Sequence, residues 1–213
     1  MSAPPATRAY LDVVSTATPD RVPNRPWRGH VIRVSCALEE GRKITAKVNL
    51  QVKPEPGWEV HPAWCRRYGA NAGHAMDSGR AVREVAESVW MLLDTADVIV
   101  CHSAAFHTGL IAQMMVDAGL AKTYSPESLR ARAYDTMAMT AEDCRIPSTN
   151  PRAFKQPRLP EAVQHFTAEM PPDIAADGMP WWKAGLVQMT SLRTVFWAKH
   201  RWGIAPEILA QEG

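Results

Sequence analysis

The stretch Asp97-Val98-Ile99-Val100-Cys101-His102-Ser103-Ala104-Ala105-Phe106-His107 decides the fold class. Its first half is a compact apolar run with the length of a buried strand. Little loop separates this run from a helical pattern that continues to Ala118 and places Phe106, Leu110, Ile111 and Met114 on one side. A buried strand that passes directly into an amphipathic helix is typical of an α/β protein.

Three more strands are predicted before this unit. Residues 9–14 are almost wholly apolar, with one acid, Asp12, which suits the centre of a sheet. Two alternating segments then predict an antiparallel hairpin with its turn at Glu40-Gly41. Their apolar faces are Ile32, Val34, Cys36 and Leu38, followed by Ile44, Ala46, Val48, Leu50 and Val52. The other face of the second segment is expected to meet solvent: Lys43, Thr45, Lys47, Asn49, Gln51 and Lys53.

The remaining pattern predicts a helix over 82–93, a strand over 133–137, a helix from Leu159 and a long helix over 182–201. With 213 residues and 46% apolar content, the chain suits a single domain over residues 1–213. Residues 1–7 and the proline-rich loop 147–158 are expected to be irregular, and residues 18–29 to form an exposed loop. The fold class is therefore α/β, with a mixed central sheet of an antiparallel three-strand meander plus parallel strands, flanked by helices.

Net charge, cysteine spacing and the absence of several motifs limit the classes of protein to consider. A net charge of +2 is too small to identify a nucleic-acid binder. The four cysteines are far apart and form no zinc motif, so they are expected to be reduced. No signal peptide or apolar run long enough for a membrane span is present, which favours a cytoplasmic protein. Walker, GxSxG, HExxH and GxGxxG motifs are absent.

Four segments carry a family resemblance. They are Asp12-Val13-Val14-Ser15-Thr16, His102-Ser103-Ala104-Ala105-Phe106-His107, Tyr134-Asp135-Thr136-Met137 and Trp182-Lys183-Ala184-Gly185-Leu186-Val187-Gln188. In this order they resemble the motifs of the DnaQ-like (DEDD) 3′-to-5′ exonucleases, and the match covers nearly the whole chain. His61-Pro62 and Tyr68-Gly69-Ala70-Asn71 give moderate further support. The resemblance implies a ribonuclease-H-like fold.

The resemblance also implies that most of the catalytic site is replaced. Asp12 is the one retained family carboxylate, while the family's Glu in the first motif corresponds to Val14. The Asp of the second motif corresponds to His107, and the general-base His and final Asp of the last motif correspond to Trp182 and Val187. A shift of one residue would use Trp181, which supplies neither carboxylate nor imidazole.

These substitutions bear directly on metal binding. Family enzymes use two divalent ions about 4 Å apart, held by four carboxylates. Asp12 alone could bind one ion weakly. A rearranged site of Asp12 and His107 with Asp173 or Asp177 is one alternative, and a merely hydrogen-bonded His107 is the other. No cofactor is expected, with Mg or Mn required if the protein is active.

Several residues are candidates for nucleic-acid contact by the same resemblance: Thr16, Arg21, Arg25, Arg28, Ser103, Phe106 and Trp182. The three arginines could contact phosphates or lie in a solvated loop. Trp181 and Trp182 could stack on a base or pack in the core.

Three functions remain open at this point. The first is a non-catalytic module that binds single-stranded nucleic acid or a 3′ end, or docks on a polymerase or other replication or repair protein. The second is an active metal-dependent 3′-to-5′ exonuclease on DNA or RNA with an altered metal site. The third is a structural or inhibitory protein without a nucleic-acid ligand. The first is favoured, which leans against enzymatic activity without deciding it, and no membrane partner is expected.

Overall fold

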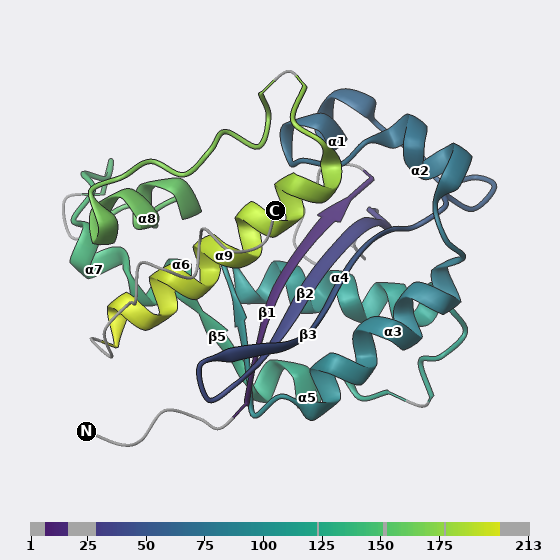
Figure 1. The fold of residues 1–213 in the computed structure, drawn as a ribbon, viewed down its shortest axis with the longest axis horizontal. Helices are drawn as coiled ribbons and strands as arrows, with labels where there is room; N and C mark the ends of the chain where they lie inside the picture. Colours follow the sequence, from purple (N-terminus) through teal and green to yellow (C-terminus); the bar gives the residue numbers. More distant parts are fainter. Residues whose placement is uncertain (1–6, 17–28, 123, 151–152, 177, 201–213) are drawn as a thin grey trace.

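The central feature is one mixed sheet. The computed structural model describes residues 7–16, 29–122, 124–150, 153–176 and 178–200. Within them five strands lie in the order β3-β2-β1-β4-β5 (Figure 1). They are β1 (Thr7–Ser15), β2 (Val31–Glu40), β3 (Lys43–Gln51), β4 (Val98–Cys101) and β5 (Ala133–Asp135). β2 is antiparallel to β1 and β3, whereas β4 is parallel to β1 and β5 to β4. The predicted α/β class and mixed sheet are confirmed.

Helices cover both faces of this sheet. They are α1 (Pro62–Arg67), α2 (Ala72–Ser78), α3 (Val82–Thr95), α4 (Ala104–Asp117), α5 (Pro126–Ala131), α6 (Thr136–Met139), α7 (Ala141–Cys144), α8 (Leu159–Thr167) and α9 (Trp181–Lys199). Leu11 and Val13 of β1 pack with α3 and α4, whereas Tyr10 packs with α8 and α9. In Figure 1, α9 crosses one face of the sheet and α4 lies on the other. Because β1 side chains alternate between faces, Asp12 lies on the α9 face.

Most predicted elements are confirmed with small shifts at their ends. β1 begins at Thr7, within a segment that we expected to be irregular. The predicted strand over 133–137 stops at Asp135, because that side chain caps α6. The described parts of 147–158 contain neither helix nor strand. Residues 17–28, most of the predicted exposed loop, and Arg201 lie outside the described residues.

Two expectations about strand faces were wrong. The far end of β3 is covered rather than solvated, since Gln51 is 3% exposed and Asn49 donates a hydrogen bond to the Trp182 carbonyl of α9 (2.6 Å). Ile32 does not share a cluster with Val34, because the β1–β2 register shifts at the end of β1. Ile32 instead packs with Val14, beneath α1 and α2. In the described part of the chain, no helix has the length and apolar character needed to cross a membrane.

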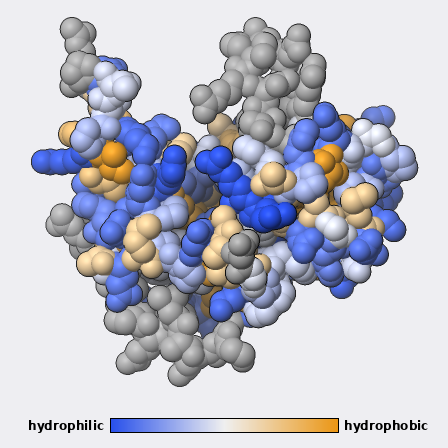
Figure 2. Space-filling model, turned by 90° about the horizontal axis from the view of Figure 1, so that it is seen from above, coloured by the Kyte–Doolittle hydropathy of each residue, from blue (hydrophilic) through white to orange (hydrophobic). Residues whose placement is uncertain are grey.

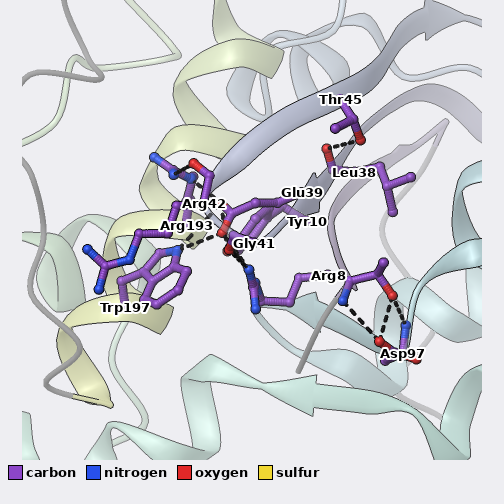
Figure 3. A network of polar contacts seen from close by, with 11 residues as sticks. Arg8, Tyr10, Leu38, Glu39, Gly41, Arg42, Thr45, Asp97, Arg193 and Trp197 are labelled. Atoms are coloured by element: carbon purple, nitrogen blue, oxygen red, sulfur yellow. Dashed lines mark hydrogen bonds and ion pairs between the residues drawn. The ribbon is translucent and has the colours of Figure 1, made fainter. Parts of the chain in front are cut away.

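The buried carboxylate of Glu39 links β1, β2 and α9 through hydrogen bonds and ion pairs. Glu39 of β2 is fully buried and accepts hydrogen bonds from Arg8 Nη2 (2.9 Å), Trp197 Nε1 (3.1 Å) and Tyr10 Oη (3.3 Å). Arg193 of α9 forms a second ion pair with it, and Figure 3 shows these side chains converging on Glu39. Burial and the nearby Glu39 raise the pKa of Tyr10 well above its usual range. Removing Glu39 would leave buried cations uncompensated, so this cluster is structural.

Candidate functional site

Asp12 forms an ion pair with a buried arginine. It stands opposite Ser35 in the β1–β2 register, and Arg33 lies two residues along β2 on the same face. Nη2 of Arg33 contacts Asp12 Oδ2, with the two side chains 0% and 14% exposed, respectively. Arg33 Nη1 donates to the Gly69 carbonyl (2.7 Å). Burial lowers the pKa of Arg33, while the Asp12 carboxylate favours its charged form. The one retained acid of the motif therefore faces a fixed organic cation.

His107 is buried and uses both ring nitrogens. Nδ1 accepts from the Val13 N–H (3.1 Å), so Nε2 carries the proton and donates to the His102 carbonyl (2.9 Å). β4 ends at Cys101, and His107 supplies the acceptor that Val13 needs beyond that end. Burial lowers the pKa of His107, which favours this neutral tautomer. Of the two interpretations of His107, the hydrogen-bonded residue is the arrangement present.

Val14 occupies an apolar pocket where the family carries a glutamate. It is 3% exposed and packs with Ile32 and Cys65, together with alanines of the α1–α2 region. A carboxylate placed there without a metal would be buried against apolar side chains at a large energetic cost. The local packing is therefore adapted to an aliphatic residue.

The beginning of α9 presents two tryptophans in different environments. Trp182 is 51% exposed, and Trp181 stacks on His74 of α2 with ring centroids 5.2 Å apart. Neither ring belongs to a buried core cluster of the described residues. Val187 is half-buried. Neither Trp181 nor Trp182 carries a proton-accepting group.

Two glycines let α9 and the α1–α2 turn sit close to the sheet. A Cβ at Gly185 would meet Ser35 Oγ and would lie 2.5 Å from Asn49 Oδ1. Gly69 has φ +75°, and a Cβ there would lie 2.6 Å from Ala184 Cβ. Ser35 in turn donates to Asn49 Oδ1 (2.8 Å). Small residues thus allow the polar sheet face around Asp12 to be covered at this end.

The carboxylate of Asp135 caps the helix of the second motif, α4, and a second helix, α6. Ser103 has the left-handed φ of 78° that favours glycine or asparagine. The backbone N–H groups of Ser103 and Ala104 donate to the Asp135 carboxylate (3.0 and 2.8 Å). Asp135 also accepts from Met137 N (3.0 Å) at the start of α6. Asp135 therefore caps two helices, and Phe106 packs half-buried against the core.

His102, directly after β4, hydrogen-bonds the proline-rich loop. Its Nε2 donates to the Pro157 carbonyl (2.8 Å), and Nδ1 lies 2.9 Å from Thr136 Oγ1. Burial lowers the pKa of His102 to about 4, so the ring is neutral near pH 7. Thr16 is fully buried, and its hydroxyl accepts from the His30 N–H (3.2 Å). His102 could therefore not receive a nucleophile's proton without losing a hydrogen bond, and Thr16 is too deeply buried to meet a phosphate.

The described residues do not fit a pair of divalent ions. They contain no group of three or more His, Cys, Asp or Glu side chains able to hold a metal. Asp173, considered for a rearranged site, accepts a hydrogen bond from Ala175 N (2.9 Å). Asp177 and the loop arginines Arg21, Arg25 and Arg28 lie outside the described residues. Among the described residues, Asp12 thus has no neighbouring ligand set that would hold a metal ion.

Arg33, Asn49 and Gly69 were not identified from the sequence as site residues. The sequence does contain a pattern that indicates Arg33. The predicted segment 31–38 pairs on one side with the strand over residues 9–14 and on the other with the strand over residues 44–52. Its polar residues Arg33 and Ser35 alternate with the apolar ones and must share a covered face with Asp12. A charged residue on that face needs a partner, and Asp12 is the nearest acid in the register.

Comparison with known proteins supports the fold through structure rather than sequence. No family model and no curated protein matches the chain. The chain is similar to E. coli exonuclease I in complex with a dT13 oligonucleotide, with a TM-score of 0.65, 12% identity and 96% of this chain covered. It covers only 42% of exonuclease I.

Two shorter nucleases match over most of both chains. One is a 3′-exonuclease solved for 3′-end-specific recognition of histone mRNA stem-loop, with a TM-score of 0.60, 10% identity, and 95% of this chain and 84% of that chain covered. The other is the nuclease domain of 3′hExo, a DEDDh family member bound to rAMP, with a TM-score of 0.58, 11% identity, and 92% and 93% covered. At such low identity the likeness concerns the fold alone. The chain has the ribonuclease-H-like fold of the DnaQ-like (DEDD) 3′-exonucleases.

Proposed function

We propose that this protein is a non-catalytic module that binds single-stranded nucleic acid at or near a 3′ end. The observation that carries the proposal is the ion pair between Asp12 and Arg33, on a scaffold otherwise used by 3′-exonucleases. The similar solved structures include exonuclease I with an oligonucleotide, a 3′-exonuclease solved for 3′-end-specific recognition of histone mRNA stem-loop, and a nuclease domain bound to rAMP. A scaffold can keep its ligand class after its chemistry is lost.

Arg33 competes with a divalent ion for the same carboxylate. A metal at Asp12 would have to displace a guanidinium that is fully buried and also bound to the Gly69 carbonyl. Separating a buried ion pair costs about 3–5 kcal/mol, because one charge is left unpaired. Asp12 alone gives at most one weakly held ion in return, because Mg²⁺ at such sites is bound by one or two carboxylates in addition to substrate phosphates, and a pair of ions needs more.

The lost base adds a second obstacle to hydrolysis. General-base catalysis contributes roughly a hundred- to ten-thousand-fold in rate. Trp182 has no proton-accepting group, and His102 and His107 use both their ring nitrogens in hydrogen bonds. An active exonuclease would need a different base and a different metal site. A polymerase or repair partner remains a prediction.

The test measures binding and cleavage on the same protein. A 5′-fluorescein-labelled single strand is incubated with Mg²⁺ or Mn²⁺, and its length is followed on a denaturing gel. We expect intact strand, together with fluorescence-anisotropy binding at low salt that persists in EDTA. Shortening from the 3′ end that Asp12→Ala abolishes, in a variant that circular dichroism shows to be folded, would establish the exonuclease instead. Absence of binding to any DNA or RNA strand would leave the structural role.

A further inference from the structure

We propose that Tyr68 and Trp182 form a base-stacking surface, with Arg66, Arg67 and Lys183 contacting the phosphates of a single strand. This surface comprises the end of α1 and the beginning of α9. The inference rests on the proposed function and specifies where and how the strand is bound. It assigns the binding role to residues outside the family's catalytic motifs, with the exception of Trp182 and Lys183.

Both rings are available to a ligand. Trp182 is 51% exposed and Tyr68 is 37% exposed, although large aromatic side chains are normally covered. Trp64 supports Tyr68 from α1, with ring centroids 4.4 Å apart. A supported ring that is partly exposed can stack on a nucleobase, because every base has a π-face.

The residues around Asp12 hold the two aromatic segments in place. Arg33 donates to the Gly69 carbonyl (2.7 Å), directly after Tyr68. Asn49 donates to the Trp182 carbonyl itself (2.6 Å). Both donors stand on the covered face of the sheet, and Gly185 allows the close approach of α9 there. The former catalytic face thus acts as the rigid base of the stacking surface.

Positive charge accompanies the rings. Arg66 and Arg67 end α1, Lys183 follows Trp182, and all three are exposed. The guanidinium of Arg67 lies 5.9 Å from the Tyr68 ring centroid. Among the described residues none of the three forms an ion pair, whereas the nearby acid Glu59 is paired with His61 (3.3 Å). Unpaired cations beside exposed rings match the phosphates and bases of a single strand.

The surrounding surface favours nucleic acid over an apolar protein partner. Figure 2 views the molecule from above, the side on which α1 and α2 lie in Figure 1. Apolar residues form only small separate spots there, among hydrophilic ones. Protein-docking sites in general present a larger continuous apolar patch.

The test compares single variants by fluorescence anisotropy with a labelled oligothymidylate and a labelled oligouridylate. Trp182→Ala and Tyr68→Ala should each weaken binding roughly 5- to 150-fold, the range expected for one lost stacking contact. Trp182→Phe should keep most of the affinity, since a ring remains. Met91→Ala is the matched control, because Met91 is 70% exposed on α3, a helix of the other sheet face. Circular dichroism and thermal unfolding verify that each variant is folded.

Charge variants test the phosphate contacts separately. Arg66→Gln and Arg67→Gln should each reduce the slope of log affinity against log salt by about 0.7, the value for one phosphate contact on a single strand. Arg83→Gln on α3, where Arg83 is paired with Glu87, should leave the slope unchanged. If the wild type binds and the aromatic variants bind equally well, this surface is refuted while the proposed function stands. If the wild type binds no strand at low salt, the proposed function fails and the inference fails with it.

Discussion

Replacing Arg33 with methionine tests whether the Asp12–Arg33 pair stabilises the fold. Methionine has a similar length but no charge and no donor. Arg33→Met would leave the Asp12 carboxylate, 14% exposed, without its cation. It would also leave the Gly69 carbonyl without the donor that it has in the wild type. The wild-type pair should therefore contribute measurably to the free energy of unfolding.

The expected loss follows from burial. Breaking a buried ion pair by removing one partner costs about 3–5 kcal/mol. Because Asp12 retains some contact with water, we expect the lower end, about 3 kcal/mol, for Arg33→Met. For a domain of this length each kcal/mol lowers the melting temperature by about 2–4 °C, which gives a decrease of roughly 6–12 °C.

A double-mutant cycle isolates the pair. Arg33→Met/Asp12→Leu removes both charges, and it should recover much of the stability lost in Arg33→Met, because no buried charge is then left unpaired. Urea unfolding followed by far-UV circular dichroism measures all four proteins. Arg83→Met is the control, since that arginine forms an exposed pair with Glu87 and should change stability by less than about 0.5 kcal/mol. Two results would refute the reasoning. One is a loss of unfolding free energy below about 1 kcal/mol for Arg33→Met. The other is a loss in the double variant that equals or exceeds the sum of the losses in the two single variants.

Three further outcomes are expected from the same structure. The pKa of His102 is about 4, below its unfolded value, and the pKa of His107 is also lowered by burial, so both contribute stability above pH 6.5. For His102, up to about 3 kcal/mol should be lost as the pH falls from 6.5 toward 4, and a flat urea midpoint across that range would contradict this. Ser103→Gly should raise stability by about 1 kcal/mol, because it relieves a left-handed φ of 78°, and Ser103→Val should lower it. Gly185→Ala should destabilise by about 1–3 kcal/mol through overpacking, whereas Gly73→Ala, whose Cβ would have its nearest neighbour at 3.5 Å, should be neutral or stabilising in the same thermal-unfolding assay.

The long elements were predictable because their periodicity is strong. The run before Cys101 and the spacing over 82–93 determine a strand and a helix almost independently of context. The five short helices, none longer than seven residues, were not predicted. A helix of one or two turns has too few residues to show a 3.6-residue period, and its stability comes from tertiary packing.

The faces of the strands were harder to predict than their existence. The shift in register between Val14 and Ser15 places Ile32 in a different hydrophobic cluster from Val34. No pattern in the local sequence predicts such a bulge. Gln51 was assigned to solvent because it is polar and alternates with apolar residues. It is buried because it hydrogen-bonds the Asn71 carbonyl (3.1 Å), a contact across 20 residues of sequence.

At the candidate site, the sequence revealed which groups are missing but not what replaces them. The absence of carboxylates at Val14 and Val187 can be read from single positions. The pairing of Asp12 with Arg33 depends on two strands lying side by side, and the exposure of Trp182 depends on how α9 is seated by Gly185. Contacts of this kind exist only once the sheet is assembled.

The presence of Asp12 is no evidence for catalysis, because that carboxylate is also the partner of the buried Arg33. β1 and β2 are joined by two buried ion pairs of opposite polarity, Arg8 with Glu39 and Asp12 with Arg33. If the register slipped by one residue, each charge would face the opposite side of the sheet and lose its partner. Losing Asp12 alone would leave Arg33 charged and fully buried. An acid that specifies strand register would therefore be kept whether or not a metal ever binds, so the distinction between binding and cleavage must be sought at the surface of α1 and α9.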